Sequence, residues 1–391
     1  MGYFILWVKM ISFQLDEIHE QIRDTIRKFA IEEIAPTAIQ RDITGEFPRE
    51  IIKKLGELGF LGMMVSPQWG GSGLDTISYV IAMEEISKVD ASVGVIFSVH
   101  NSLVNWIFEK YGSDLLKEKY LRRLAAGEII GAYCLSEPEA GSDATQIKTF
   151  AVRKGDRWIL NGTKNWITTG QNADIYVVFA NTNFDLGYKG ITCFAVEKGT
   201  PGFEPGKKED KMGLRSSDTT SIGLTNVEVP DENIIGKVGE GFYIAMRGLN
   251  GGRIGIAAQA LGIAQGAFEA SVRYAKERKA FGKPIIEHQL IQAKLAQMSM
   301  KINAARLLIY KAAWLRDNGF DHIQEASEAK LFATTIANEI TREAVQIHGG
   351  YGYVREYQVE RMMRDAKVTE IYEGTSEIQH LVIAREIMKK W

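Results

Sequence analysis

The order in which the hydrophobic pattern changes along the chain constrains its fold most. Up to about residue 126 and again after about 247, apolar side chains recur at three- and four-residue steps, as in helices. Between them lie short runs of β-branched and aromatic residues, which favour strands. No proline lies between Pro67 and Pro138 or after Pro284, which is compatible with long helices. This order excludes the alternating βαβ pattern of a Rossmann domain.

We therefore expect an α+β multi-domain fold. Its parts are an N-terminal all-α domain (1–128), a central β-barrel-like domain (129–240) and a C-terminal four-helix bundle (241–391). The expected helices of the bundle are 247–277, 287–316, 321–347 and 375–389.

Local signals refine this expectation. An apolar helix face runs through Leu15, Ile18, Ile22, Ile26, Phe29 and Ile34. Pro36 is expected to end that helix, and another is expected to begin after Pro48. Asn161-Gly162 has the composition of a hairpin turn.

Composition excludes several classes of function. A net charge of -2 over 391 residues argues against nucleic acid as the main partner. Cys134 and Cys193 form no metal or disulfide motif, and the histidines are scattered, so we expect no metal site. The apolar run 4–8 is too short for a secretory signal, and Met10 follows it closely. We find no later stretch long enough to cross a membrane, and expect a cytoplasmic protein.

Two segments of the β region could contact a polar, flat ligand. YCLSEPEAGSD (133–143) offers hydroxyls and backbone donors, although it could be an ordinary surface loop. NWITTG (165–170) places a tryptophan beside two threonines, an arrangement suited to a heteroaromatic cofactor. Taken alone, the second segment is better explained by a tryptophan packed in the β core.

Two further segments lie at helix ends. Arg278 and Lys279 in RKAFGKP (278–284) could pair with a diphosphate, or simply complement the dipole of the helix that ends there. In IYEGTSEIQ (371–379), Ser376 and Gln379 have capping-box spacing, and Glu373 precedes the helix. Glu373 could be the base of a site, or merely a favourable charge near a helix N-terminus.

Together with QIHGGYGY (346–353), these segments, in this order, resemble the acyl-CoA dehydrogenase family from about Leu15 to the last helix. The resemblance implies FAD bound between the β domain and the bundle, usually in a homotetramer in which a neighbouring subunit touches part of each FAD. It implies cofactor-binding roles for Tyr133, Cys134, Leu135, Ser136, Gly141, Ser142, Trp166, Ile167, Thr168, Arg278, Phe281, Gln289, Gln346, Gly349, Gly350, Thr375 and Glu377. It implies substrate-binding roles for Ser142, Asn250, Arg253 and Gly374.

The resemblance also implies a reaction. Glu373 would remove the C2 proton of an acyl-CoA thioester, hydrogen bonds would stabilise the developing enolate, and flavin N5 would take hydride from C3. Electrons would pass to an electron-transfer flavoprotein. Some members carry the base at the position that aligns with Gly252, which leaves the role to Glu373 here and leaves room in the pocket.

The segment VGVIFSVHNSL (93–103) looks like short-chain members, and glycine at 94 disfavours a dicarboxylate substrate. Ser136, Glu139 and Asn250 depart from residues common in the family, which puts exact substrate contacts in doubt. Two alternatives stay open: an acyl-CoA oxidase, which is usually longer, and a non-catalytic homologue that binds flavin or acyl-CoA, which the intact Glu373 disfavours. The fatty-acid or amino-acid pathway also stays open.

Overall fold

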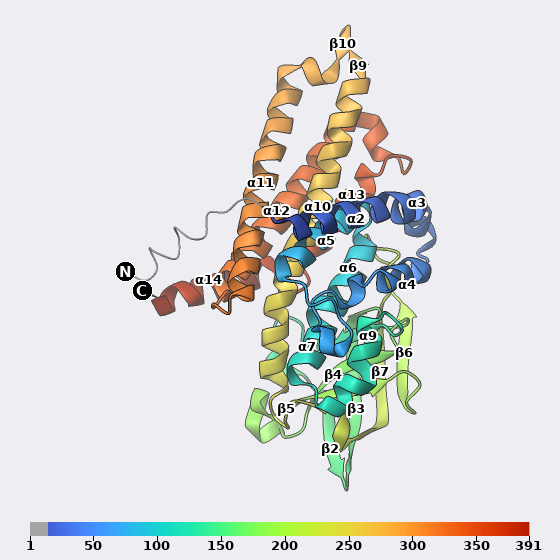
Figure 1. Ribbon diagram of the computed structural model, residues 1–391, viewed down its shortest axis with the longest axis vertical. Coiled ribbons are helices and arrows are strands. Elements are labelled where there is room, and N and C mark those ends of the chain that lie inside the picture. The colour runs from blue at the N-terminus through green and yellow to red at the C-terminus, as the bar shows by residue number, and fades with distance from the viewer. Residues whose placement is uncertain (1–14, 391) are drawn as a thin grey trace.

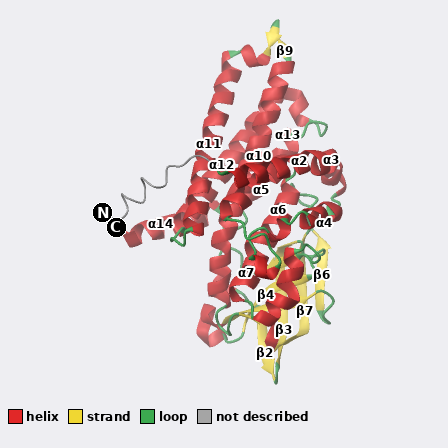
Figure 2. Cartoon of the chain, in the orientation of Figure 1, coloured by secondary structure: helices red, strands yellow, loops and turns green. Residues whose placement is uncertain are grey.

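The computed structural model describes residues 15–390, so the predicted apolar run 4–8 and Met10 lie outside the described residues. Helices form both ends of the described chain and a sheet lies between them in sequence, which confirms the predicted order (Figure 2). The molecule is elongated, with the sheet at one end and the tip of two long helices at the other (Figure 1).

The first part is built of helices. Its helices are α2 (Glu17–Phe29), α3 (Ala35–Thr44), α4 (Arg49–Glu57), α5 (Thr76–Val89), α6 (Ala91–Ser98), α7 (Trp106–Tyr111), α8 (Asp114–Leu116) and α9 (Arg122–Ala125). Most of the predicted apolar face of α2 is buried, but Ile18 is exposed. The prediction that Pro36 ends the helix is wrong. The chain passes through a π-helical turn into α3, and Pro36 lies in the first turn of α3, where its missing N–H costs no hydrogen bond.

The prediction that no stretch is apolar enough to span a membrane needs correction. The helical run Ala91–Tyr111, which contains α6 and α7, has sufficient length and hydropathy. Its apolar window is 94% buried inside the protein, however, and the core helices of globular proteins pass the same test. The run is therefore apolar because it packs on every side.

The central part is one sheet of β1 (Gly131–Cys134), β2 (Phe150–Lys154), β3 (Arg157–Thr168), β4 (Ile175–Asn181), β5 (Ile191–Glu197), β6 (Phe203–Lys208), β7 (Thr219–Pro230) and β8 (Ile234–Ile235). The hydrogen-bonded order is β6-β7-β3-β2-β4-β5-β8, with β1 parallel to β4. The predicted Asn161-Gly162 turn is wrong, because both residues lie inside β3 at a register shift against β7. The turn between β2 and β3 is Gly155-Asp156 instead, and Gly155 has a φ of +67°.

Strand β4 joins the sheet to the helices. Tyr176 and Val178 pack into the sheet's own core, whereas Val177 and Phe179 belong to the large core shared with the helices. Successive residues of a strand point to opposite faces, so both faces of β4 are buried. The continuous apolar run of β4 follows from this position.

The last part contains α10 (Gly241–Glu277), α11 (Gln289–Asp317), α12 (Ile323–His348), α13 (Val359–Thr369) and α14 (Ser376–Lys390). A small hairpin of β9 (Lys279–Ala280) and β10 (Lys283–Pro284) connects α10 to α11. The predicted helices are present, but α10 begins before 247 and α13 was missed. α14 projects from the body of the molecule (Figure 1).

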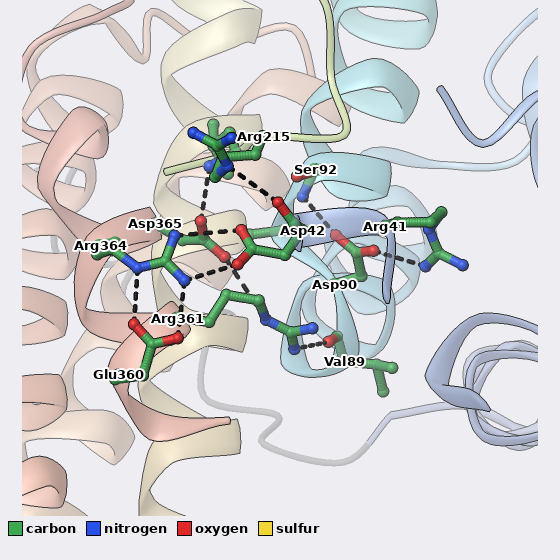
Figure 3. Close-up of polar contacts among 12 residues, drawn as sticks. Arg41, Asp42, Val89, Asp90, Ser92, Arg215, Glu360, Arg361, Arg364 and Asp365 are labelled. Carbon is green, nitrogen blue, oxygen red and sulfur yellow. Dashed lines mark hydrogen bonds and ion pairs between the residues drawn. The ribbon is translucent and has the colours of Figure 1, made fainter. Parts of the chain in front are cut away.

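A buried network of charges ties the three parts together where α13 meets α3 and the loop before β7 (Figure 3). Arg364 forms ion pairs with Glu360 and Asp42, both at 2.7 Å. Asp365 accepts a hydrogen bond of 2.6 Å from the backbone N–H of Leu214. Burial raises the pKa of Asp365 to about 7, although the nearby Arg361 opposes this. The network fixes the sheet against the helices on the side away from the projecting α14.

Candidate active site

Glu373 lies in a turn of unusual backbone conformation between α13 and α14. Its φ is +54° and that of Gly374 is +90°. Left-handed backbone costs a non-glycine residue about 1–2 kcal/mol, so surrounding contacts must hold Glu373 in place. The predicted capping box is wrong: the N–H of Ile378 donates to the Thr375 hydroxyl at 3.3 Å, and the Ser376 hydroxyl has no partner among the described residues.

Two side chains hold the carbonyl groups of this turn. Gln379 donates from Nε2 to the carbonyl oxygens of Glu373 at 3.2 Å and Gly374 at 2.9 Å. Lys330 of α12 donates from Nζ to the Gly374 carbonyl at 2.8 Å. These bonds hold the turn that carries the Glu373 carboxylate.

Glu373 is half-buried, and Oε2 of its carboxylate is buried against α10. A Cβ atom placed on Gly252 would lie 2.6 Å from Oε2 of Glu373, so the carboxylate occupies the space that a side chain at 252 would fill. Oε2 has no hydrogen-bond partner among the described residues. Burial raises the pKa of Glu373 to about 7, against the opposing charges of Arg253 and Lys330. A carboxyl group of this kind is suited to general-base catalysis near neutral pH.

Polar side chains surround the carboxylate. Arg253 is buried and donates to Asn250 Oδ1 at 3.0 Å and to the Ser327 hydroxyl at 3.3 Å. Burial lowers the pKa of Arg253 to about 10, and the Glu373 charge opposes this. Burial raises the pKa of Tyr133 well above its usual value, and the Glu373 charge adds to this effect. The predicted residues Glu373, Gly374, Arg253, Asn250 and Tyr133 are therefore brought together.

The loop after β1 is held by a buried ion pair. Lys164 of β3 lies 2.7 Å from Oε1 of Glu137, and both side chains are buried. Glu137 also accepts hydrogen bonds from the backbone N–H groups of Lys148 and Thr149. Although burial raises the pKa of Glu137, Lys164 and these hydrogen bonds hold it below the usual value. The pair fixes the predicted cofactor loop to the strand that carries Trp166.

Trp166 is not packed in the β core, so the simpler explanation of that residue is wrong. Its side chain is 61% exposed and its φ is +60°. The N–H of Asn165 donates to the carbonyl oxygen of Ser136 at 2.9 Å, which places Trp166 beside the loop after β1. Ser136 and Thr168 are half-buried next to it. Cys134, Leu135 and Ile167 are buried beneath this surface, whereas Gly141 and Ser142 are exposed.

Other predicted cofactor residues lie at the opposite end of the molecule. Arg278, Gly349 and Gly350 line a cavity of about 520 Å³ beside the β9–β10 hairpin. Arg278 lies over the Tyr351 ring, 5.6 Å from its centroid. Phe281 is 96% exposed at the tip. Gln289 and Gln346 are also exposed on this part of the bundle.

One chain does not bring the two groups of cofactor residues together. Tyr133 donates to the Ala245 carbonyl near the start of α10 at 3.5 Å, whereas Arg278 directly follows its last residue. The 37 residues of α10 span about 55 Å at 1.5 Å per residue. Thr375 and Glu377 lie at a third location, at the start of α14, half-buried and exposed respectively.

Several residues of this site were not expected from the sequence. Lys330 has no exposed surface and lies on the same helix face as Ala326, Ala333 and Ala337. A lysine at this position of an otherwise apolar helix face was therefore the feature of the sequence that could have indicated a buried functional residue. Gln259 accepts a hydrogen bond from the Tyr372 hydroxyl and donates to the Ala91 carbonyl at 2.7 Å. No pattern in the sequence indicates that contact. Over residues 15–390, no three or more His, Cys, Asp or Glu residues are grouped as metal ligands would be.

Comparison with known proteins identifies the family. Models of the acyl-CoA dehydrogenase N-terminal, middle and C-terminal domains match residues 16–128, 132–227 and 239–388. The chain belongs to the acyl-CoA dehydrogenase family. It is therefore an FAD-dependent oxidoreductase that acts on acyl-CoA.

Within that family the chain resembles short-chain, butyryl-CoA dehydrogenase-like members. It is 49% identical to the short-chain specific acyl-CoA dehydrogenase of Clostridium acetobutylicum over 97% of this chain and 100% of that one. It superposes on butyryl-CoA dehydrogenase from Megasphaera elsdenii with a TM-score of 0.95 and 46% identity, covering 97% and 100% of the chains.

A third similar chain comes from a structure described as the electron transferring flavoprotein of Acidaminococcus fermentans, studied for flavin-based electron bifurcation. The TM-score is 0.96 and the identity 48%, with 97% of this chain and 100% of that chain covered.

The residues on the sheet and at the bundle tip fit FAD. The exposed Trp166 indole and the half-buried hydroxyls of Ser136 and Thr168 suit a flat ring with polar edges. The cavity at the other end presents Arg278 and open glycine backbone, a donor set suited to a diphosphate.

Proposed function

We propose that this enzyme removes two hydrogens from C2 and C3 of a short, saturated acyl-CoA to give trans-2-enoyl-CoA, with Glu373 as the base. The observation that carries the proposal is the Glu373 carboxylate, whose Oε2 atom is buried without a hydrogen-bond partner among the described residues and whose pKa is about 7. FAD, when bound, supplies the oxidising chemistry by accepting hydride from C3 at its N5 atom.

The residues of the chain prepare the proton transfer. Burial makes Glu373 a stronger base than an exposed carboxylate, and the unpaired Oε2 is available to take the C2 proton. The positive charge of Arg253 limits that rise in pKa, so a substantial fraction of Glu373 is ionised at neutral pH. Among the described residues the backbone N–H of Glu373 has no hydrogen-bond partner, so in this proposal it donates to the thioester oxygen.

The packing around Gly94, near the base, supports an acyl chain without a second carboxylate. A Cβ atom on Gly94 would lie 2.3 Å from the Ser87 hydroxyl and 3.7 Å from Nε2 of Gln259. Gln259 in turn contacts Tyr372, next to the base. An arginine at 94, which a dicarboxylate-specific member would use, has no room here without displacing these neighbours.

A second copy of the chain completes the cofactor site in this proposal, within a homotetramer. Its support is the distance along α10 between the contact of Tyr133 with Ala245 and Arg278, about 50 Å at 1.5 Å per residue, which one dinucleotide does not bridge. The proposed electron acceptor is an electron-transfer flavoprotein. Its support is the similar chain in the structure of the Acidaminococcus fermentans protein.

The test is anaerobic reduction of the purified, FAD-loaded protein by butyryl-CoA. We expect the flavin absorbance at about 450 nm to bleach. Glu373→Gln should retain the yellow colour and lose the bleaching, because the amide does not accept the C2 proton. Rapid bleaching of the Glu373→Gln protein would place the base elsewhere. Rapid re-oxidation of the reduced wild type by air alone would favour an oxidase.

A further inference from the structure

Lys330 is an unusual residue for the centre of a protein. It is fully buried in α12, and Nζ makes a single hydrogen bond, to the Gly374 carbonyl at 2.8 Å. Across residues 15–390, no carboxylate lies within 4.0 Å of its ammonium group. A buried charge without a close counterion is costly, so a neutral side chain of the same size would be the simpler choice for stability alone.

The position of Lys330 explains what the charge does. The Gly374 carbonyl that it holds belongs to the residue directly after Glu373, in a turn where both residues have positive φ. Gln379 binds the same carbonyl from α14 at 2.9 Å. Side chains from α12 and α14 therefore both donate to the Gly374 carbonyl oxygen. The Glu373 carboxylate, which extends from the same turn, lies against Gly252.

The charges around Lys330 come from every element packed against it. Arg253 lies on α10, Glu370 follows α13, Glu373 lies in the turn and Glu377 lies on α14. Burial lowers the pKa of Lys330 to about 8, and the Glu373 charge opposes this more than any other group. In return, the Lys330 charge lowers the pKa of Glu373. The two side chains are therefore coupled, although they form no direct ion pair.

We propose that Lys330 is a positioning residue for proton abstraction: its ammonium group holds the Gly374 carbonyl, fixes the left-handed turn and keeps the adjacent Glu373 carboxylate charged and aimed at the substrate. The inference rests on the proposed role of Glu373 as the base. It adds a fully buried residue on α12 that acts through the backbone of the turn.

The test compares Lys330→Gln and Lys330→Met with wild type in single-turnover bleaching by butyryl-CoA between pH 6 and 9. Lys330→Gln retains a donor and loses the charge, so the acid limb of its pH profile should move up by about one unit, with a high-pH plateau within threefold of wild type. Lys330→Met loses both, so its plateau should also fall at least tenfold. Half-saturation by butyryl-CoA should change less than threefold in both variants.

Lys301→Met is the matched control. Lys301 lies on α11, is about one-third exposed and pairs with Glu339, so the variant loses the same charge away from the site. Its profile should match wild type. Hydrogen exchange of the 370–379 backbone should accelerate in Lys330→Met and stay at the wild-type rate in Lys301→Met. Wild-type profiles and exchange rates in both Lys330 variants would overturn the proposal.

Two further measurements separate the possible failures. If Glu373→Gln still bleaches, the proposed function fails; if it does not bleach and the Lys330 variants behave as wild type, only the role of Lys330 fails. Should neither Lys330 variant fold, Gln379→Met decides, because it removes the second donor to the Gly374 carbonyl and keeps the Lys330 charge. Its bleaching rate should fall at least tenfold with the acid limb at the wild-type pH, and a wild-type rate would overturn the proposal that holding this carbonyl positions Glu373.

Discussion

The contact between Gly252 and Glu373 predicts that Gly252→Ala loses activity while the protein stays folded. The added Cβ would lie 2.6 Å from Oε2 of Glu373, and ordinary contact begins at 3.4 Å, so the carboxylate must move by about 0.8 Å. A misplacement of about 1 Å in a catalytic group can reduce a rate about 100-fold, or about 2.7 kcal/mol in the barrier. We therefore expect the single-turnover bleaching rate to fall about 100-fold.

Stability should change little in Gly252→Ala. Alanine is favoured over glycine in a helix by about 0.5–1 kcal/mol, and the clash involves only the end of a flexible side chain. Gly248→Ala on the same helix is the control, since its Cβ would meet nothing closer than Ile107 Cδ1 at 3.5 Å. It should bleach at the wild-type rate. Wild-type bleaching by Gly252→Ala would refute the placement of the base against α10.

Three further predictions concern the supports of the site and of the fold. Lys164→Met leaves the buried Glu137 unpaired, so unfolding in urea should show a loss of about 3–5 kcal/mol, and FAD should be released more readily; an unchanged midpoint would contradict the role of the pair. The pKa of Asp365 is raised in the folded state, so its contribution to stability is present below about pH 4 and is lost as pH rises through about 7. The free energy of unfolding of wild type should therefore fall relative to Asp365→Asn between pH 4 and 7, and parallel curves would show that Asp365 does not titrate there. Thr375→Ala removes the cap of α14 and should lower the free energy of unfolding by about 1 kcal/mol in chemical denaturation, whereas Ser376→Ala should change it little. Equal losses in the two variants would support a cap at Ser376 instead.

The sequence predicted the helical and β segments because their periodicities differ. It failed where two local signals compete. Asn161-Gly162 and Gly155-Asp156 both have turn chemistry, and only the pairing of β3 with β7 as well as β2 shows which of them turns. Pro36 has the chemistry of a helix end and also of a first helical turn, and the π-helical turn before it decides between them. The glycines at 236, 239 and 241 disfavour helix locally, so the start of α10 was placed at 247, too late by six residues.

The candidate site was predictable as motifs and not as geometry. The placement of Glu373 came from its motif, but its contact with Gly252 joins residues more than a hundred positions apart, and the left-handed turn is held in part by Lys330, 44 positions from Gly374. Lys330 and Gln259 act through contacts that carry no motif, and Gln379 lies in the motif but holds the carbonyls of the turn instead of forming the predicted capping box. The resemblance assigned both Arg278 and Trp166 to the cofactor site, and the structure shows that within one chain these two residues lie at opposite ends of the molecule.

The length of α10 has a consequence for how the cofactor is retained. If each FAD is held by Trp166 of one chain and Arg278 of another, cofactor binding and subunit association are linked equilibria, and each strengthens the other. Dilution that separates the subunits then releases FAD, and added FAD drives them back together. The apparent affinity for FAD then depends on the protein concentration as well as on the residues that contact FAD.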